Sequence, residues 1–70
     1  MESFKPDSSN VLEVSYDGTK EEMTITFKGN RAYKYSQVSN NIFTQMKEAE
    51  SVGKFVNDRI IGLYPTERVS

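Results

Sequence analysis

One stretch of the chain decides its fold. It reads Met23-Thr-Ile-Thr-Phe-Lys-Gly-Asn-Arg-Ala-Tyr-Lys-Tyr35. Apolar and aromatic residues fall on alternate positions on both sides of Gly29-Asn30, which is the period of a strand with one buried face. Glycine followed by asparagine suits a two-residue turn of type I′ or II′. The stretch therefore predicts an antiparallel hairpin, with one strand from Met23 to Lys28 and the next from Arg31 to Tyr35.

The residues before this hairpin predict one further strand. Between residues 10 and 16 the chain alternates again, and Leu12, Val14 and Tyr16 form the predicted inward face. Asp17-Gly18 then signals a turn into the hairpin. Residues 1–9 are polar and are interrupted by Pro6, so we expect a flexible N-terminal arm followed by a single domain over residues 10–70.

After Tyr35 the apolar period changes from two to 3.6, which indicates two helices. Ser39 or Asn40 is the expected cap of the first helix and Ser51 that of the second, while Gly62 is typical of a helix end. The two apolar stripes are Val38, Ile42, Phe43, Met46 and Ala49, and then Val52, Phe55, Val56 and Ile60. The order β-β-β-α-α predicts an α+β fold. We expect a three-stranded antiparallel meander with both helices packed on one face and the third strand at the sheet edge.

Composition excludes several kinds of chemistry. The 70 residues include no cysteine and no histidine, so disulfides and the usual zinc, copper and iron ligand sets are absent. The serines have no histidine to activate them, and the carboxylates fall on predicted exposed faces or in loops. We therefore expect no enzyme activity, no metal and no cofactor. No apolar run reaches the roughly twenty residues of a membrane span, and residues 1–9 lack the apolar core of a signal peptide. We expect a cytoplasmic protein.

Charge is nearly balanced over the chain but not along it. Nine basic and ten acidic side chains give a net charge of −1, which argues against a protein held on duplex nucleic acid by bulk charge. The predicted hairpin, residues 23–35, nevertheless carries three cations and two tyrosines and contains no acidic residue. Its candidate nucleic-acid-binding residues are Lys28, Arg31, Tyr33, Lys34 and Tyr35, since single strands are bound by stacking and by cations along the backbone. The alternative is that both tyrosines pack in the core.

A second candidate lies at the start of the second predicted helix. Ser51, Gly53 and Lys54 would offer backbone N–H groups and one cation to an anion. The spacing is not that of a phosphate-binding P-loop. Every helix start has free N–H groups, so the alternative is a capping serine and a glycine needed for close packing.

Several motifs of the chain resemble the KTSC domain family, whose members occur alone in bacterial and phage proteins and at the C-terminus of some lysyl-tRNA synthetases. The most characteristic are the central Tyr-x-Tyr of Tyr33-Lys34-Tyr35 and a downstream Ala-x-Ser-x-Gly-Lys/Arg-Tyr/Phe, here residues 49–55. Further matching residues are Ser8-Ser9, Tyr16-Asp17, Phe27, Val38, Asn57, Ile60 and Tyr64-Pro65. The chain departs from the family at Ser39, where proline is usual.

The resemblance implies a role in RNA binding, which the attachment to a tRNA synthetase suggests for this family. Carried over, that role would involve the Tyr-x-Tyr motif and the three residues at the second helix start. Our leading hypothesis is a non-catalytic module for RNA or single-stranded nucleic acid. The alternatives are a phage- or mobile-element-encoded accessory protein that binds a host protein or a second copy of itself through a sheet edge, and capture of a small anionic or nucleotide ligand.

Overall fold

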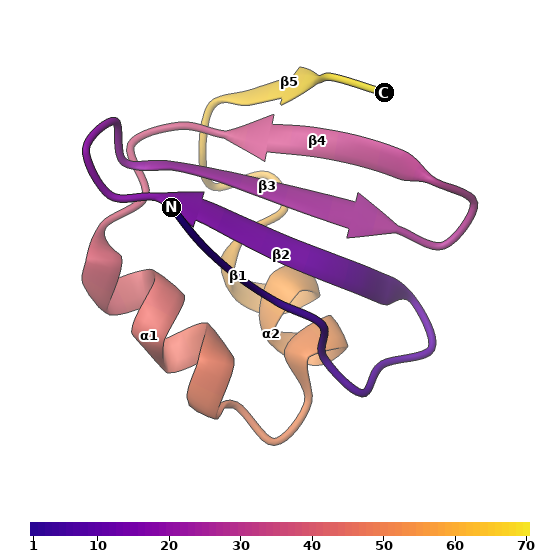
Figure 1. Cartoon of the computed structure of the whole chain (residues 1–70). Coiled ribbons are helices and arrows are strands. Elements are labelled where there is room, and N and C mark those ends of the chain that lie inside the picture. Colours follow the sequence, from indigo (N-terminus) through magenta and orange to yellow (C-terminus); the bar gives the residue numbers. More distant parts are fainter.

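The computed structural model describes residues 1–70 and has a five-stranded antiparallel sheet with two helices on one of its faces (Figure 1). The strands are β1 Glu2–Phe4, β2 Val11–Asp17, β3 Glu22–Phe27, β4 Arg31–Tyr35 and β5 Thr66–Arg68, and they lie in the sheet in that order. The helices are α1 Asn40–Glu48 and α2 Val52–Arg59. The predicted α+β class and the packing of both helices on one face are confirmed. The predicted three-stranded meander is incomplete, because a strand is added at each edge.

The first added strand is β1, where the sequence predicts a flexible arm. It pairs with β2, and Phe4 lies opposite Val14. The Phe4 ring is 5.8 Å from the Phe43 ring of α1, and the Glu2 carboxylate is 3.5 Å from the Lys47 ammonium group. Three residues with a single aromatic side chain are too few to show a strand period, so these contacts left no signal in the sequence.

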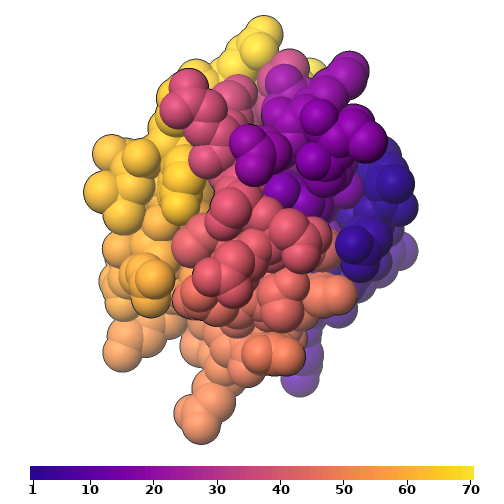
Figure 2. All heavy atoms as spheres, turned by 90° about the vertical axis from the view of Figure 1, so that its left-hand side faces the viewer, coloured from indigo at the N-terminus to yellow at the C-terminus, as the bar shows by residue number.

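The second added strand is β5, which covers the edge of β4. The Ser36 N–H donates to the Pro65 carbonyl at 2.9 Å, and the Val69 N–H donates to the Ala32 carbonyl at 2.9 Å. All three residues of β5 are exposed, so the strand is held by backbone pairing and by an ion pair between Glu67 and Lys34 of β4, not by a buried side chain. The prediction that the Arg31–Tyr35 strand forms the sheet edge is therefore wrong. The free edges belong to β1 and β5, and the two terminal segments lie on opposite sides of the molecule (Figure 2).

The register of β2 differs from the prediction at one position. The pairing with β3 shifts between Val11 and Glu13, which is a β-bulge. Val11 is consequently buried (0% exposed), whereas Leu12 is 41% exposed. The prediction of an inward Leu12 is wrong because the bulge moves the inward position one residue earlier, while Val14 and Tyr16 point inward as expected.

The hairpin between β3 and β4 has a loop of three residues. Phe27 pairs with Arg31, so Lys28, Gly29 and Asn30 lie between the strands. The Asn30 N–H donates to the Phe27 carbonyl at 3.0 Å. Gly29 and Asn30 have φ angles of 89° and 61°, the region that glycine and asparagine tolerate best. The predicted two-residue turn is therefore one residue shorter than the loop in the structure, although Gly29 and Asn30 do form the turn as predicted.

The core lies between the sheet and the helices. The Tyr16 ring stacks on the Phe43 ring with centroids 4.8 Å apart, and its hydroxyl donates to the Val38 carbonyl at 2.7 Å. Burial, with smaller effects of Glu21 and Asp17, raises the pKa of Tyr16. Both predicted serine caps are confirmed, because the Ser39 hydroxyl accepts from the Ile42 N–H of α1 and the Ser51 hydroxyl from the Lys54 N–H of α2.

Candidate functional site

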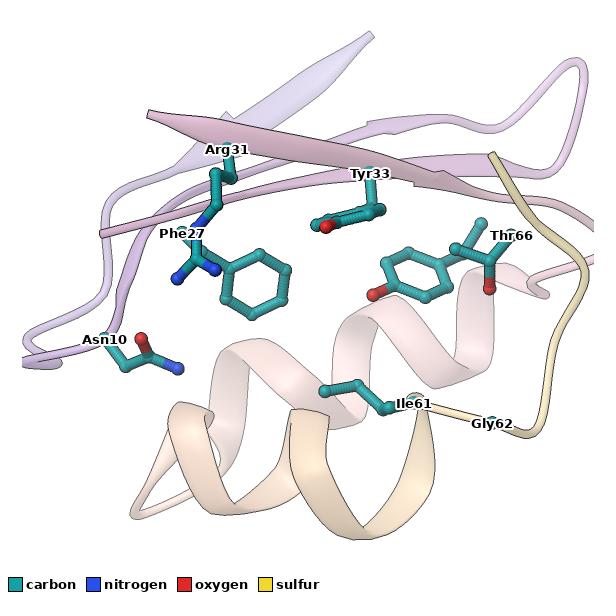
Figure 3. Close-up of a pocket in the computed structure, with 8 residues that line it drawn as sticks. Asn10, Phe27, Arg31, Tyr33, Ile61, Gly62 and Thr66 are labelled. Carbon is teal, nitrogen blue, oxygen red and sulfur yellow. The ribbon is translucent and has the colours of Figure 1, made fainter. Parts of the chain in front are cut away.

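A cavity of about 340 Å³ opens between β4 and the residues that follow α2 (Figure 3). Its lining consists of Asn10, Phe27, Arg31, Tyr33, Tyr35, Ile61, Gly62 and Thr66. The lining contains one guanidinium group and no carboxylate. The volume is near the lower end of the range for ligand pockets, about 300–1,000 Å³. We call this cavity the β4 pocket.

Aromatic side chains form the sheet side of the β4 pocket. Phe27 and Tyr33 meet edge to face, with ring centroids 6.0 Å apart and planes inclined by 67°. Ile61 lies opposite them, on the segment that follows α2, and is 49% exposed (Figure 3). Apolar side chains of the sheet and of the segment after α2 therefore face each other across the β4 pocket.

The two tyrosines of β4 differ in accessibility. Tyr35 is only 3% exposed and belongs to the core, whereas Tyr33 is half-buried and packs at the edge of the core. Both lie on the helix side of the sheet, with Phe27, as the sequence predicts. Burial, and to a smaller extent Tyr33, raises the pKa of Tyr35. Tyr33 is therefore the tyrosine whose ring a ligand could contact over a large area.

Arg31 supplies the positive charge of the β4 pocket. It is two residues from Tyr33 on the same strand, so both side chains lie on the same side of the sheet. Its Nη2 donates to the Lys28 carbonyl at 3.4 Å, and it has no salt bridge to a carboxylate. Figure 3 shows its guanidinium group at one end of the pocket, near Asn10. The charge is available to an anion on the ligand.

The other two predicted cations are placed differently. Lys34 points to the opposite face of the sheet, where its ammonium group is 3.9 Å from Glu22 and 3.5 Å from Glu67. Lys28 lies in the exposed hairpin loop next to Arg31. The structure thus brings Arg31, Tyr33 and Tyr35 together, places Lys28 beside them and separates Lys34 from them.

Sequence reasoning missed a further cation, Arg68. It lies opposite Tyr33 in the pairing of β4 with β5, and residues paired in this way point to the same side of a sheet. Its side chain is exposed, and its Nε donates to the Ser70 carbonyl at 3.0 Å. No local signal could have identified it, because only the pairing of β5 places it next to Tyr33.

Asn10 was also missed, and its backbone is firmly held. The Lys28 N–H donates to the Asn10 carbonyl at 2.7 Å, and the Asn10 N–H donates to the Ser8 hydroxyl at 3.2 Å. The carboxamide lies at the end of the β4 pocket beside Arg31 (Figure 3). It adds one donor and one acceptor to an otherwise aromatic and cationic site.

The residues of the second candidate have local structural roles. The Ser51 hydroxyl caps α2 at 3.2 Å from the Lys54 nitrogen, and a Cβ on Gly53 would lie 3.3 Å from the Ser8 hydroxyl. Ser51 and Lys54 border a shallow hollow that also includes Glu50, Asp58 and Arg59. Two acids and two bases leave this hollow without net charge. Gly53 instead allows α2 to approach the segment between β1 and β2.

No group of three or more acidic side chains is placed to hold a metal ion. Neither α1 nor α2 has the length and apolar character that a membrane-spanning helix requires.

Comparison with known proteins identifies the family. The KTSC domain family matches residues 7–64. A protein of Tsukamurella paurometabola is 33% identical over 55 residues, which cover 77% of this chain and 82% of that protein. The crystal structure of a KTSC domain protein from Yersinia pestis has a TM-score of 0.92 at 23% identity, and the match covers 99% of this chain and 97% of that one. At that identity the likeness shows a shared fold. The chain belongs to the KTSC domain family, as its motifs predict.

Proposed function

We propose that the chain is a non-catalytic module that binds single-stranded nucleic acid, RNA foremost, by taking one unstacked base into the β4 pocket. The observation that carries the proposal is the placement of Tyr33 and Arg31 side by side on β4, at a cavity of about 340 Å³ that no carboxylate lines. A base would lie against Tyr33, and Arg31 would bind an adjacent phosphate.

The energetics favour a single strand over a duplex. Stacking of one base on an aromatic side chain is worth about 1–3 kcal/mol, and it requires a base that is free of its own stack. Duplex binding depends instead on a broad basic surface, and this chain has a net charge of −1. A half-buried ring beside a guanidinium group that has no salt bridge therefore suits single-stranded RNA better than a double helix.

Lys28 and Arg68 add two positive charges close to Arg31. Lys28 lies in the hairpin loop and Arg68 opposite Tyr33 on β5, so both flank the ring that would receive the base. We call Lys28, Arg31 and Arg68 the cationic rim. These residues would contact the backbone and position the strand without selecting its sequence.

The test is a fluorescence-polarisation titration with a labelled uridylate dodecamer at low salt. Tyr33→Leu keeps an apolar side chain but removes the ring, so we expect Kd to rise about 5- to 150-fold, the equivalent of one stacked base. Tyr33→Phe keeps the ring and should bind within about threefold of the wild type. Lys34→Gln is the matched control on the opposite face and should bind as the wild type does.

Two results would refute the proposal. One is no measurable binding of the dodecamer by the wild type at low salt. The other is equal binding by Tyr33→Leu and the wild type, with circular dichroism showing both to be folded.

A further inference from the structure

Charges beyond the β4 pocket limit how much of a strand the domain can hold. The cationic rim consists of Lys28, Arg31 and Arg68, and the two arginines lie on the pocket side of β4 and β5. Arg31 is the only lysine or arginine that lines the β4 pocket, and Lys28 and Arg68 lie beside the pocket, in the hairpin loop and opposite Tyr33 on β5. The rim can therefore neutralise about three phosphates, one for each cation.

A strand that continued past β5 would meet carboxylates. On β5 the residue before Arg68 is Glu67, whose side chain lies on the outer face of the sheet and is 3.5 Å from Lys34. The outer face also carries Glu13, Asp17 and Glu22, against the single cation Lys34. Additional phosphates on this side would be repelled by an excess of negative charge.

We infer that the binding unit of this domain is a short single-stranded segment of about three nucleotides, with one base in the β4 pocket and its neighbouring phosphates on the cationic rim. The inference rests on the proposed function and adds the length of the strand that one copy of the domain binds. Such a domain would bind a strand end, a loop or a short unpaired segment, and would not contact a long strand continuously.

Isothermal titration calorimetry with unlabelled uridine monophosphate, the uridylate trimer and the uridylate dodecamer tests the binding unit. We expect the trimer to bind at least about tenfold more tightly than the monophosphate, since it adds phosphates for two further cations. The dodecamer should bind more than one copy of the protein, with a Kd for each site within about threefold of that of the trimer. Arg68→Gln should weaken the trimer about threefold or more.

Each contrary result has a definite meaning. One copy bound to the dodecamer, with a site at least about tenfold tighter than that of the trimer, would show a continuous track and overturn the inference while the proposed function stands. A monophosphate that binds as tightly as the trimer would also overturn it, in favour of nucleotide capture. If neither the trimer nor the dodecamer binds, the proposed function fails and the inference fails with it.

Discussion

The salt dependence of binding gives the sharpest test of the site, because its slope counts the phosphates that the protein contacts. On single strands, log K falls with log salt by about 0.7 for each phosphate neutralised. Three contacts, to Lys28, Arg31 and Arg68, predict a slope of about −2 for the wild type. Kd should therefore rise about 100-fold between about 20 mM and 200 mM salt.

Arg31→Gln removes one of these contacts without charging the pocket. The arginine side chain is exposed and has only a weak hydrogen bond, of 3.4 Å, to the Lys28 carbonyl, so the fold should not change. The slope should fall to about −1.4, and the same increase in salt should then raise Kd only about 25-fold. Arg68→Gln should give a similar slope. Lys34→Gln should leave the slope unchanged, because its ammonium group is engaged with Glu22 and Glu67 on the other face.

The measurement is fluorescence polarisation with the uridylate dodecamer over the same salt range at constant pH. An unchanged slope in Arg31→Gln would refute the assignment of a phosphate to this residue. A slope that falls in Lys34→Gln and not in Arg31→Gln would place the strand on the outer face of the sheet and refute the role of the β4 pocket.

Further predictions concern the fold. Tyr16→Phe removes the hydroxyl that donates to the Val38 carbonyl at 2.7 Å, so we expect the free energy of unfolding to fall by about 1–3 kcal/mol. Urea denaturation measures this loss, and a loss below about 0.5 kcal/mol would contradict the prediction. Gly53→Ala should lower Tm in a thermal melt, although alanine has the better helix propensity. The added Cβ would lie 3.3 Å from the Ser8 hydroxyl, which already accepts two N–H groups. A raised Tm would show that Ser8 can move and would contradict the prediction. The raised pKa values of Tyr16 and Tyr35 predict that the free energy of unfolding falls as pH rises above about 10, because these tyrosines lose their protons at lower pH in the unfolded chain than in the folded one. Denaturation curves from pH 8 to 11 measure this decline, and its absence would contradict the prediction.

The sequence predicted those parts of the fold that local physics determines. The alternation in residues 23–35 and the change of period after Tyr35 gave the hairpin and both helices. Ser51 was identified as a cap, and Ser39 as one of two candidates beside Asn40, because a side-chain oxygen at that position accepts an N–H that the helix leaves free. Phe27 and the two tyrosines were correctly placed on one side of the sheet, since the strand period fixes that relation.

Features that depend on pairing between distant segments were not predicted. β1 and β5 are each three residues long, and β5 has no buried side chain, so neither shows a pattern. The bulge that turns Val11 inward, and not Leu12, depends on the register of β2 with β3. Arg68 was missed for the same reason. One of the three residues of the cationic rim is therefore placed by the pairing of β4 with β5 and not by any motif.

The β4 pocket lies where the chain leaves α2 and turns toward β5, because Ile61 and Gly62 of this segment line it together with Phe27, Arg31 and Tyr33 of the sheet. The helix ends at Arg59, and Gly62, with a φ of 83°, turns the chain toward β5. At the β4 pocket the sheet therefore faces the non-helical segment that contains Ile61 and Gly62. The same strand thus places Tyr35 in the core and Tyr33, which is half-buried, at the edge of the core, so the two tyrosines of one motif differ in accessibility.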